Sequence, residues 1–211
     1  MPQLTRRSLA AAFAVLAVTL APSASAFAQA ARDQSAERFV AAGAQHVISV
    51  LADRGMSDAQ KAAAFHRYID EIADVPKITN FVLGKYARTI TPPQRTQFAQ
   101  AFRVYAERVY RNRLDDYHGE TVRVTGSTIR KPGDVIVATE VSGGKVTQPI
   151  QVSWRVLGGD GAWKVVDVQF KGVWLAITQQ QDFVSTIDNA HGDIDVLIAR
   201  LNRDAKTPPP Q

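Results

Sequence analysis

The sequence predicts an α+β fold in which helices flank a four-stranded antiparallel meander. Apolar residues recur at helical spacing up to about residue 117 and again after residue 176, whereas they alternate with polar residues between residues 122 and 170. Glycine-rich turns divide the alternating region into successive strands. A sheet with one apolar face needs a cover, and the aromatic-striped helices can supply it.

Four helices are expected before the sheet. The first spans residues 32–54, and the second starts at Ser57, which has the spacing of a capping box with Gln60. A third, short helix is predicted from Pro76 through Tyr86. The longest helix begins with proline in its first turn at Pro92 and runs toward Tyr117, with an aromatic face that requires a partner.

The sheet is predicted to start near Val122 and to close with Trp163–Phe170. Ser142-Gly143-Gly144-Lys145 and Gly158-Gly159-Asp160-Gly161 are expected to form its hairpin turns. Two short helices follow, over residues 177–187 and 194–201, and Asp193 has the position of an N-cap for the second.

The first thirty residues have the order of a secretory signal. Arg6 and Arg7 precede an uncharged apolar run and then small residues suited to a cleavage site. The arginine pair favours the twin-arginine route, with the general secretory route as its close competitor. We therefore expect a signal peptide over residues 1–30, a single domain over residues 31–205 that is exported to the periplasm without inserting stably in a membrane, and a disordered tail over residues 206–211.

Composition argues against several classes of function. The net charge of +5 is mild and its basic residues are scattered among acids, which does not favour nucleic-acid binding. Cysteine is absent, so neither disulfides nor thiolate metal sites are expected. The four histidines are far apart and lack metal-ligand spacing, so we predict no metal and no cofactor: His46, His66, His118 and His191.

One enzymatic hypothesis stays open. Small cone-shaped α+β domains such as ketosteroid isomerases hold an Asp base and a Tyr donor in an apolar pocket, and Asp167 and Tyr105 are the candidates here. An Asp at the edge of a sheet more often binds nearby backbone or an Arg, so we expect a structural role and no enzyme.

The aromatic side chains of the helices and the tryptophans of the sheet are the stronger signal. Periodicity cannot separate a filled interior from a hollow one, so a well-packed core or adaptor domain and a ligand cavity are both open at this point.

Several motifs resemble those of the MlaC, or toluene-tolerance, family of periplasmic lipid-transport proteins. They are Phe81-Val82-Leu83-Gly84-Lys85-Tyr86-Ala87-Arg88, Gln94-Arg95 and Phe98 to Phe102, then Trp163 to Val168, Gly172-Val173 and Phe183. Tyr110 and Tyr117 before the strand at Thr121 are similar to the helix-to-sheet junction of that family. The resemblance covers most of the chain after residue 30.

The resemblance implies a carrier that exchanges a phospholipid between an inner-membrane ABC transporter and an outer-membrane lipoprotein and porin complex, with the acyl chains in an apolar cavity between sheet and helices. We expect a monomer whose only bound group is its lipid cargo. The residues then predicted to line the pocket are Phe81, Val82, Tyr86, Phe98, Phe102, Tyr105, Val137, Val152, Trp154, Val173 and Trp174.

Two positions depart from the family pattern. Trp174 stands where a small or polar residue commonly follows Gly-Val, and Gln180 stands where a basic residue often occurs. An arginine could pair with a phosphate, so its absence weakens the case for an anionic phospholipid. The segment Ala176 to Phe183 is similar to a branch associated with hopanoid clusters, which leaves a hopanoid-like or neutral lipid as an alternative cargo.

Overall fold

The computed structural model describes residues 31–114, 117–159 and 162–205, without the side chains of residues 107–114. The predicted signal peptide (1–30) and tail (206–211) lie outside the described residues, as do Asp160 and Gly161 of the second predicted turn. The described chain is α+β, with an antiparallel sheet between two groups of helices, as the sequence predicts.

The helices before the sheet begin where the sequence places caps. Asp33, Ser57 and Asp74 each accept a hydrogen bond from a backbone N–H of the first turn, and Ser57 and Gln60 complete the predicted capping box. The elements are α1 (Gln34–Ala52), α2 (Asp58–Ile72), α3 (Val75–Val82), the 3-10 helix η1 (Gly84–Arg88) and α4 (Pro92–Leu114).

The predicted third helix is in fact two elements. Gly84, the first residue of η1, has a φ of 54°, which a continuing α-helix does not allow. A Cβ at this position would lie 2.7 Å from Cγ2 of Val184. The glycine therefore also lets the backbone at residue 84 pack closely against Val184. The prediction of a single helix from Pro76 through Tyr86 is therefore wrong.

The sheet has five strands rather than four, in the order β1-β2-β3-β4-β5, and adjacent strands are antiparallel. The additional strand pairs Val173 with Phe170 across Lys171 and Gly172, both with positive φ as in a type I′ hairpin. Two residues are too few to show alternation, so the sequence pattern missed it. The strands are β1 (Glu120–Lys131), β2 (Asp134–Gly143), β3 (Val146–Leu157), β4 (Lys164–Phe170) and β5 (Val173–Trp174).

The two faces of the sheet differ in polarity. On one face Val135, Val137 and Val156 are buried beneath Ala36 and Val40 of α1, and we call this the covered face. The other face carries charged cross-strand pairs. Arg123 lies 3.1 Å from Glu140, and Arg155 binds Asp134 through two hydrogen bonds of 3.0 and 2.9 Å.

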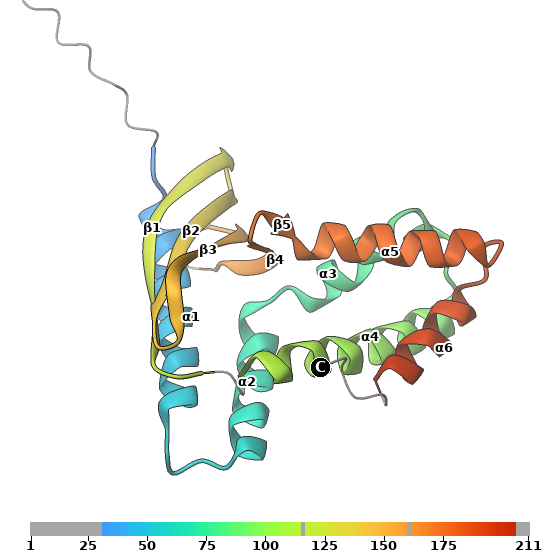
Figure 1. Cartoon of the computed structure of the whole chain (residues 1–211). Coiled ribbons are helices and arrows are strands. Elements are labelled where there is room, and N and C mark those ends of the chain that lie inside the picture. Colours follow the sequence, from blue (N-terminus) through green and yellow to red (C-terminus); the bar gives the residue numbers. More distant parts are fainter. Residues whose placement is uncertain (1–30, 115–116, 160–161, 206–211) are drawn as a thin grey trace, which may run out of the picture.

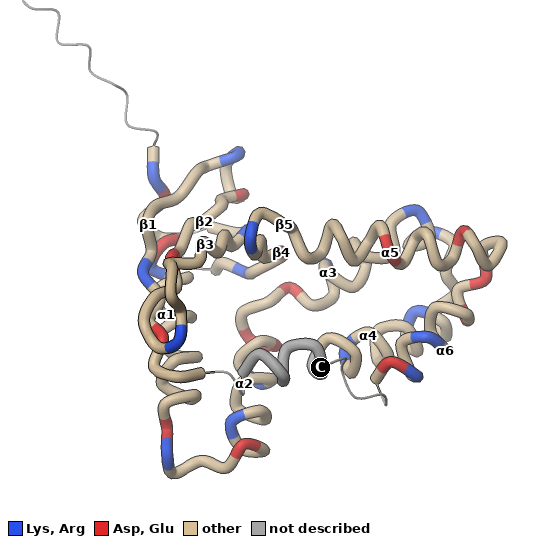
Figure 2. Tube along the Cα trace, in the orientation of Figure 1, with Lys and Arg blue, Asp and Glu red and all other residues tan. Residues whose placement is uncertain are grey.

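The remaining helices, α5 (Leu175–Asn189) and α6 (Ile194–Asp204), form the second half of the molecule together with α3 and α4. Asp193 caps α6 as predicted, because its carboxylate accepts a hydrogen bond from the N–H of Asp195. Figure 1 shows α1 alongside the sheet and α3 to α6 extending away from the edge formed by β4 and β5. Basic and acidic residues are interspersed over both halves (Figure 2).

Candidate functional site

The buried apolar residues fall into two separate clusters. The helical cluster joins α3, α4, α5 and α6, and its buried members include Val82, Leu83, Phe98, Phe183 and Ile187. The sheet cluster joins α1 to β2, β3 and β4 and the residue before β4. No buried residue in the described part of the chain belongs to both clusters, so the interior is divided between the two halves.

Aromatic rings dominate the helical cluster. Phe98 stacks on Phe102 at 5.8 Å between centroids, and both rings meet Phe183 edge-on at 5.8 and 5.6 Å. Tyr105, about one turn after Phe102 on α4, has its ring centroid 6.5 Å from that of Phe183. Phe98 and Phe183 are fully buried, whereas Phe102 and Tyr105 are only partly buried and edge the cluster.

Tryptophans hold the sheet cluster through their indole N–H groups. Nε1 of Trp163 donates to Oγ of Ser35 at 3.0 Å, which fixes the start of α1 on the sheet. Nε1 of Trp154 donates to Oγ1 of the buried Thr139, also at 3.0 Å. Trp154 is itself only partly buried, as is Val168, its partner on β4.

The two halves contact each other through α3 and α5 on β4 and through α2 on α4. Several partly buried apolar side chains that edge the clusters lie on these elements or on β3, the strand next to β4. We call this set the junction: Ile72, Trp154 and Val168 beside the sheet cluster, and Ile78, Phe102 and Tyr105 beside the helical cluster. Side chains of this kind favour a hydrocarbon guest over water, because covering them removes apolar surface from solvent.

The predicted pocket residues do not form one group. Most of those on the helices belong to the helical cluster or pack against it: Val82, Tyr86, Phe98, Phe102 and Tyr105. Val137 and Trp154 belong to the sheet cluster, and Val152 is buried in β3 in neither cluster. Phe81 and Val173 are 39% and 49% exposed, and Trp174 is partly buried in β5. Among them, Phe102, Tyr105 and Trp154 lie at the junction.

Tyr86 has a polar partner that the sequence did not indicate. Its hydroxyl donates to the carboxylate of Asp188 in α5, which also binds Nζ of Lys85 at 2.8 Å. The Lys85 ammonium and the Tyr86 hydroxyl both lower the pKa of Asp188. Tyr86 therefore fastens η1 to the end of α5.

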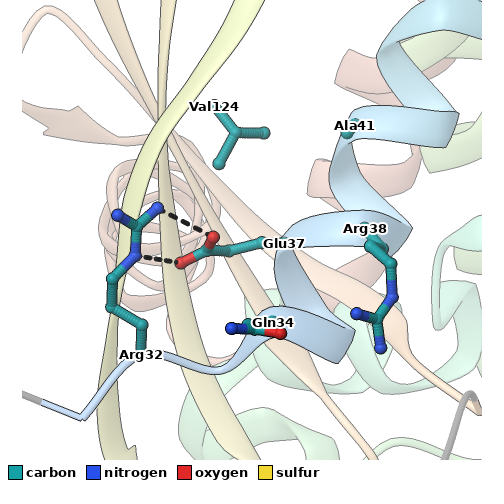
Figure 3. Close-up of a pocket in the computed structure, with 6 residues that line it drawn as sticks. All are labelled: Arg32, Gln34, Glu37, Arg38, Ala41 and Val124. Carbon is teal, nitrogen blue, oxygen red and sulfur yellow. Dashed lines mark hydrogen bonds and ion pairs between the residues drawn. The ribbon is translucent and has the colours of Figure 1, made fainter.

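Solvent-open pockets lie beside α1 and at one end of the sheet, and neither of these two contains a predicted pocket residue. One, of about 500 Å³, lies between α1 and β1, where Arg32 is paired with Glu37 at 2.8 Å (Figure 3). The other, of about 770 Å³, lies at one end of the sheet and is lined by His118, Glu120, Lys145, Ile150, Lys171 and their neighbours. The sequence pattern predicts Lys145 only as part of a turn. Lys145 and Lys171 line the same pocket because each lies in a separate hairpin at this end of the sheet.

The hydrogen bonds of Asp167 do not favour the enzymatic hypothesis. Its Oδ1 accepts hydrogen bonds of 2.8 Å from the backbone N–H groups of Val168 and Ala176. Burial raises the pKa of Asp167, and these two hydrogen bonds oppose the rise. Tyr105 packs on Phe183 within the helical cluster. The carboxylate thus serves the backbone at the start of α5, which is the structural role expected for it.

Among the described residues, no group of three or more His, Asp or Glu side chains is arranged to hold a metal ion. Within the same residues, no helix combines the length and the hydropathy of a membrane-spanning segment.

The resemblance motifs mostly occupy the scaffold of the helical half. Arg95 donates to the carbonyl of Ala87 at 2.5 Å and to Oδ1 of Asn80 at 2.9 Å. Gln180 donates from Nε2 to the carbonyl of Phe81 at 2.5 Å and so ties α5 to α3. This contact gives Gln180 a structural role in the helical half.

The fold and the junction define an α+β protein whose apolar interior is divided between a sheet half and a helical half. The chain belongs to the MlaC family: the family described as MlaC protein matches residues 42–203. Its fold is similar to that of the phospholipid-binding protein from Ralstonia solanacearum, solved in complex with a phospholipid. The two chains share 23% sequence identity with a TM-score of 0.72, over 81% of this chain and 97% of that one.

Proposed function

We propose that this protein is a periplasmic carrier that binds a phospholipid at the junction and exchanges it between an inner-membrane ABC transporter and an outer-membrane complex. Membership of the MlaC family supports the proposal, as does the phospholipid bound by the Ralstonia protein of the same fold. The partly buried apolar side chains of the junction are the observation within this chain that carries it.

The energetics explain why such a carrier must enclose its cargo. Exposing a methylene group to water costs about 0.8 kcal/mol, so two acyl chains of ordinary length cost on the order of 20 kcal/mol. We propose that the acyl chains lie between Trp154 and Val168 of the sheet half and Phe102 and Tyr105 of the helical half, all of which are partly buried. We propose that the carrier acts as a monomer without catalysis, and that export depends on residues 1–30.

A hopanoid-like or neutral lipid is the second candidate cargo. Trp174, Gln180 and the similarity of Ala176 to Phe183 to a hopanoid-associated branch motivate it, and the contact with Phe81 gives Gln180 a structural role. We favour the phospholipid because the Ralstonia protein of the same fold was solved with one bound.

The cargo can be identified directly. Protein purified from the periplasm is extracted with organic solvent and the extract is analysed by mass spectrometry, with a diacyl phospholipid as the expected species. A uniform hopanoid or other neutral-lipid signal would replace the phospholipid by the second candidate, and protein that carries no lipid at all would contradict the proposal.

The location of the site is tested by a pair of variants on one helix. Phe102→Glu places a charge at the junction, whereas Val104→Glu places the same charge on a side chain that is 49% exposed on α4. We expect Phe102→Glu to lose most of the copurified lipid and Val104→Glu to keep it, because an unpaired carboxylate disfavours hydrocarbon nearby. Thermal unfolding of both proteins controls for folding, and equal lipid content in the two folded variants would show that the site lies elsewhere.

A further inference from the structure

The pocket at the end of the sheet combines exposed cationic side chains with the end of the covered face. It lies where β1 begins, beside the β2–β3 hairpin turn and the β4–β5 turn, and we call it the lysine pocket. Its volume is about 770 Å³. Its lining residues are His118, Glu120, the segment Lys145 to Gln151, Lys171 and Gly172.

The lysine pocket has unneutralised positive charge. Neither Lys145 nor Lys171 forms an ion pair with any residue that the structure describes, and Nζ of Lys171 lies 5.5 Å from the centre of the Phe170 ring. Glu120, which also lines the pocket, accepts from the backbone N–H groups of His118 at 2.6 Å and Lys145 at 3.2 Å and keeps its negative charge, so the two lysines outweigh this carboxylate by one charge. The two ammonium groups are therefore available to an anion.

The covered face connects this pocket to the junction. Ile150 lines the pocket, and Val152 and Trp154 follow it on the same face of β3. Val152 pairs with Phe170 on β4, and Trp154 pairs with Val168. Successive residues on one face of a strand are about 6–7 Å apart, so roughly 13 Å separates Ile150 from Trp154.

The path from the lysine pocket along the covered face to the junction has a charged end and an apolar end, as a phospholipid does. Cations lie at one end, beside Phe170, and the apolar residues Trp154 and Val168 lie at the other end, next to the helical half. Ile150, Phe170, Trp154 and Val168 are all partly exposed, while Val152 between them is buried.

We propose that the lysine pocket holds the phosphate-bearing headgroup of the bound lipid, with Lys145 and Lys171 as its cationic contacts. This proposal rests on the proposed function and adds the position and chemistry of the headgroup. The acyl chains then run from Ile150 and Phe170 along the covered face toward the junction. The cargo is recognised through its phosphate, so a diacylglycerol with the same chains lacks the contacts of the lysine pocket.

The test compares two variants with equal loss of charge. Lys145→Gln with Lys171→Gln removes both pocket cations. The matched control combines Lys131→Gln, at the opposite end of the β1–β2 hairpin, with Arg88→Gln in η1. Each delipidated protein is loaded from detergent micelles with dioleoylphosphatidylglycerol or with dioleoylglycerol. Bound lipid is then quantified by mass spectrometry, and circular dichroism checks the folding of each variant.

We expect the pocket variant to bind the phosphatidylglycerol about five-fold more weakly than the wild type, which corresponds to about 1 kcal/mol for two solvent-accessible cations. Its loading with dioleoylglycerol should be unchanged, and the control variant should match the wild type with both lipids. The difference between wild type and pocket variant should shrink as salt is added, because salt screens exposed charges.

Several outcomes would overturn the proposal while leaving the proposed function intact. Equal phosphatidylglycerol loading of wild type and pocket variant would show that the lysines do not contact the headgroup, and equal losses of both lipids would show that they do not recognise phosphate. Calorimetric titration with inorganic phosphate alone identifies a site for the free anion: binding that the pocket variant loses, with unchanged lipid loading, would replace the headgroup by phosphate. Wild-type protein that loads neither lipid would instead contradict the proposed function.

Discussion

The carboxylate of Asp167 in β4 accepts a hydrogen bond of 2.8 Å from the backbone N–H of Ala176, in the first turn of α5. Trp174, the N-cap residue of that helix, provides no side-chain hydrogen bond. Asp167 thus supplies, from a neighbouring strand, the acceptor that an N-cap side chain normally provides. The contact joins the sheet half to the helical half at the edge of the junction.

Substitutions of Asp167 should separate this hydrogen bond from the charge. Asp167→Asn keeps an oxygen in the place of Oδ1, so its free energy of unfolding at pH 7 should equal the wild-type value or exceed it. Asp167→Ala removes the acceptor for two backbone N–H groups and should be less stable than the Asn variant by about 1–2 kcal/mol. Urea unfolding followed by circular dichroism measures both, and identical stabilities would mean that Asp167 does not secure α5.

The contribution of Asp167 to the free energy of unfolding should fall as the pH rises, which is the opposite of the usual case for an aspartate. Burial raises the pKa of this carboxyl in the folded protein, so between its unfolded value, about 3.9, and the raised value the folded state binds more protons than the unfolded state. Stability contributed by the protonated group is therefore lost as the pH rises through that window. Relative to Asp167→Asn, the wild type should lose unfolding free energy from pH 3 upward, and a relative gain over this range would contradict the assignment.

Asp134 should show the opposite behaviour. Its side chain is 3% exposed and binds Arg155 through two hydrogen bonds, which lower the pKa of Asp134. Asp134→Asn should reduce the free energy of unfolding at pH 7 by about 2 kcal/mol, since Arg155 loses its charged partner. This contribution is present above the unfolded pKa and is lost as the pH falls through the lowered folded pKa, so wild type and variant should converge in strong acid.

The pair of Arg123 with Glu140, whose side chains are 68% and 23% exposed, is the control for Asp134. The side chain of Arg123 is 68% exposed, so Glu140→Gln should cost less than about 1 kcal/mol. Chemical denaturation of the two variants side by side would refute the ranking if Glu140→Gln proved the more destabilising.

Gly84 should tolerate a side chain less well than Gly119. Both residues have positive φ, so alanine is strained at either position. At Gly84 the new Cβ would also lie 2.7 Å from Val184, whereas nothing lies within 4 Å at Gly119. We expect Gly119→Ala to cost about 1 kcal/mol and Gly84→Ala about 2–3 kcal/mol, measured by thermal and urea unfolding. Equal losses would show that α5 shifts to accommodate the methyl group.

Features that depend on residues close together in the sequence could be predicted from it. The capping box of Ser57 and Gln60 and the cap at Asp193 were confirmed because each involves residues within one helical turn. The break at Gly84 and the short strand β5 were missed. The first depends on the approach of Val184, a hundred residues away, and the second has too few residues to show a period.

The candidate site was harder to predict for a related reason. Phe98 and Phe102 occupy the same stripe of α4 and look equivalent in the sequence, yet only Phe98 is fully buried. Periodicity identifies which face of a helix is covered, but the exposure of each turn depends on which elements end nearby. The proximity of Lys145 and Lys171 is likewise a product of two hairpin turns, which no local pattern encodes.

The division of the buried residues into two clusters has a mechanical consequence. Since none of the described buried side chains is shared, a small shift of one half relative to the other would leave the apolar contacts inside each cluster intact. Under the proposed function, such a shift would fit lipids of different width, with the deformation confined to the few segments that cross between the halves. Release of the lipid would then need only a small displacement of the two halves and no unfolding of either.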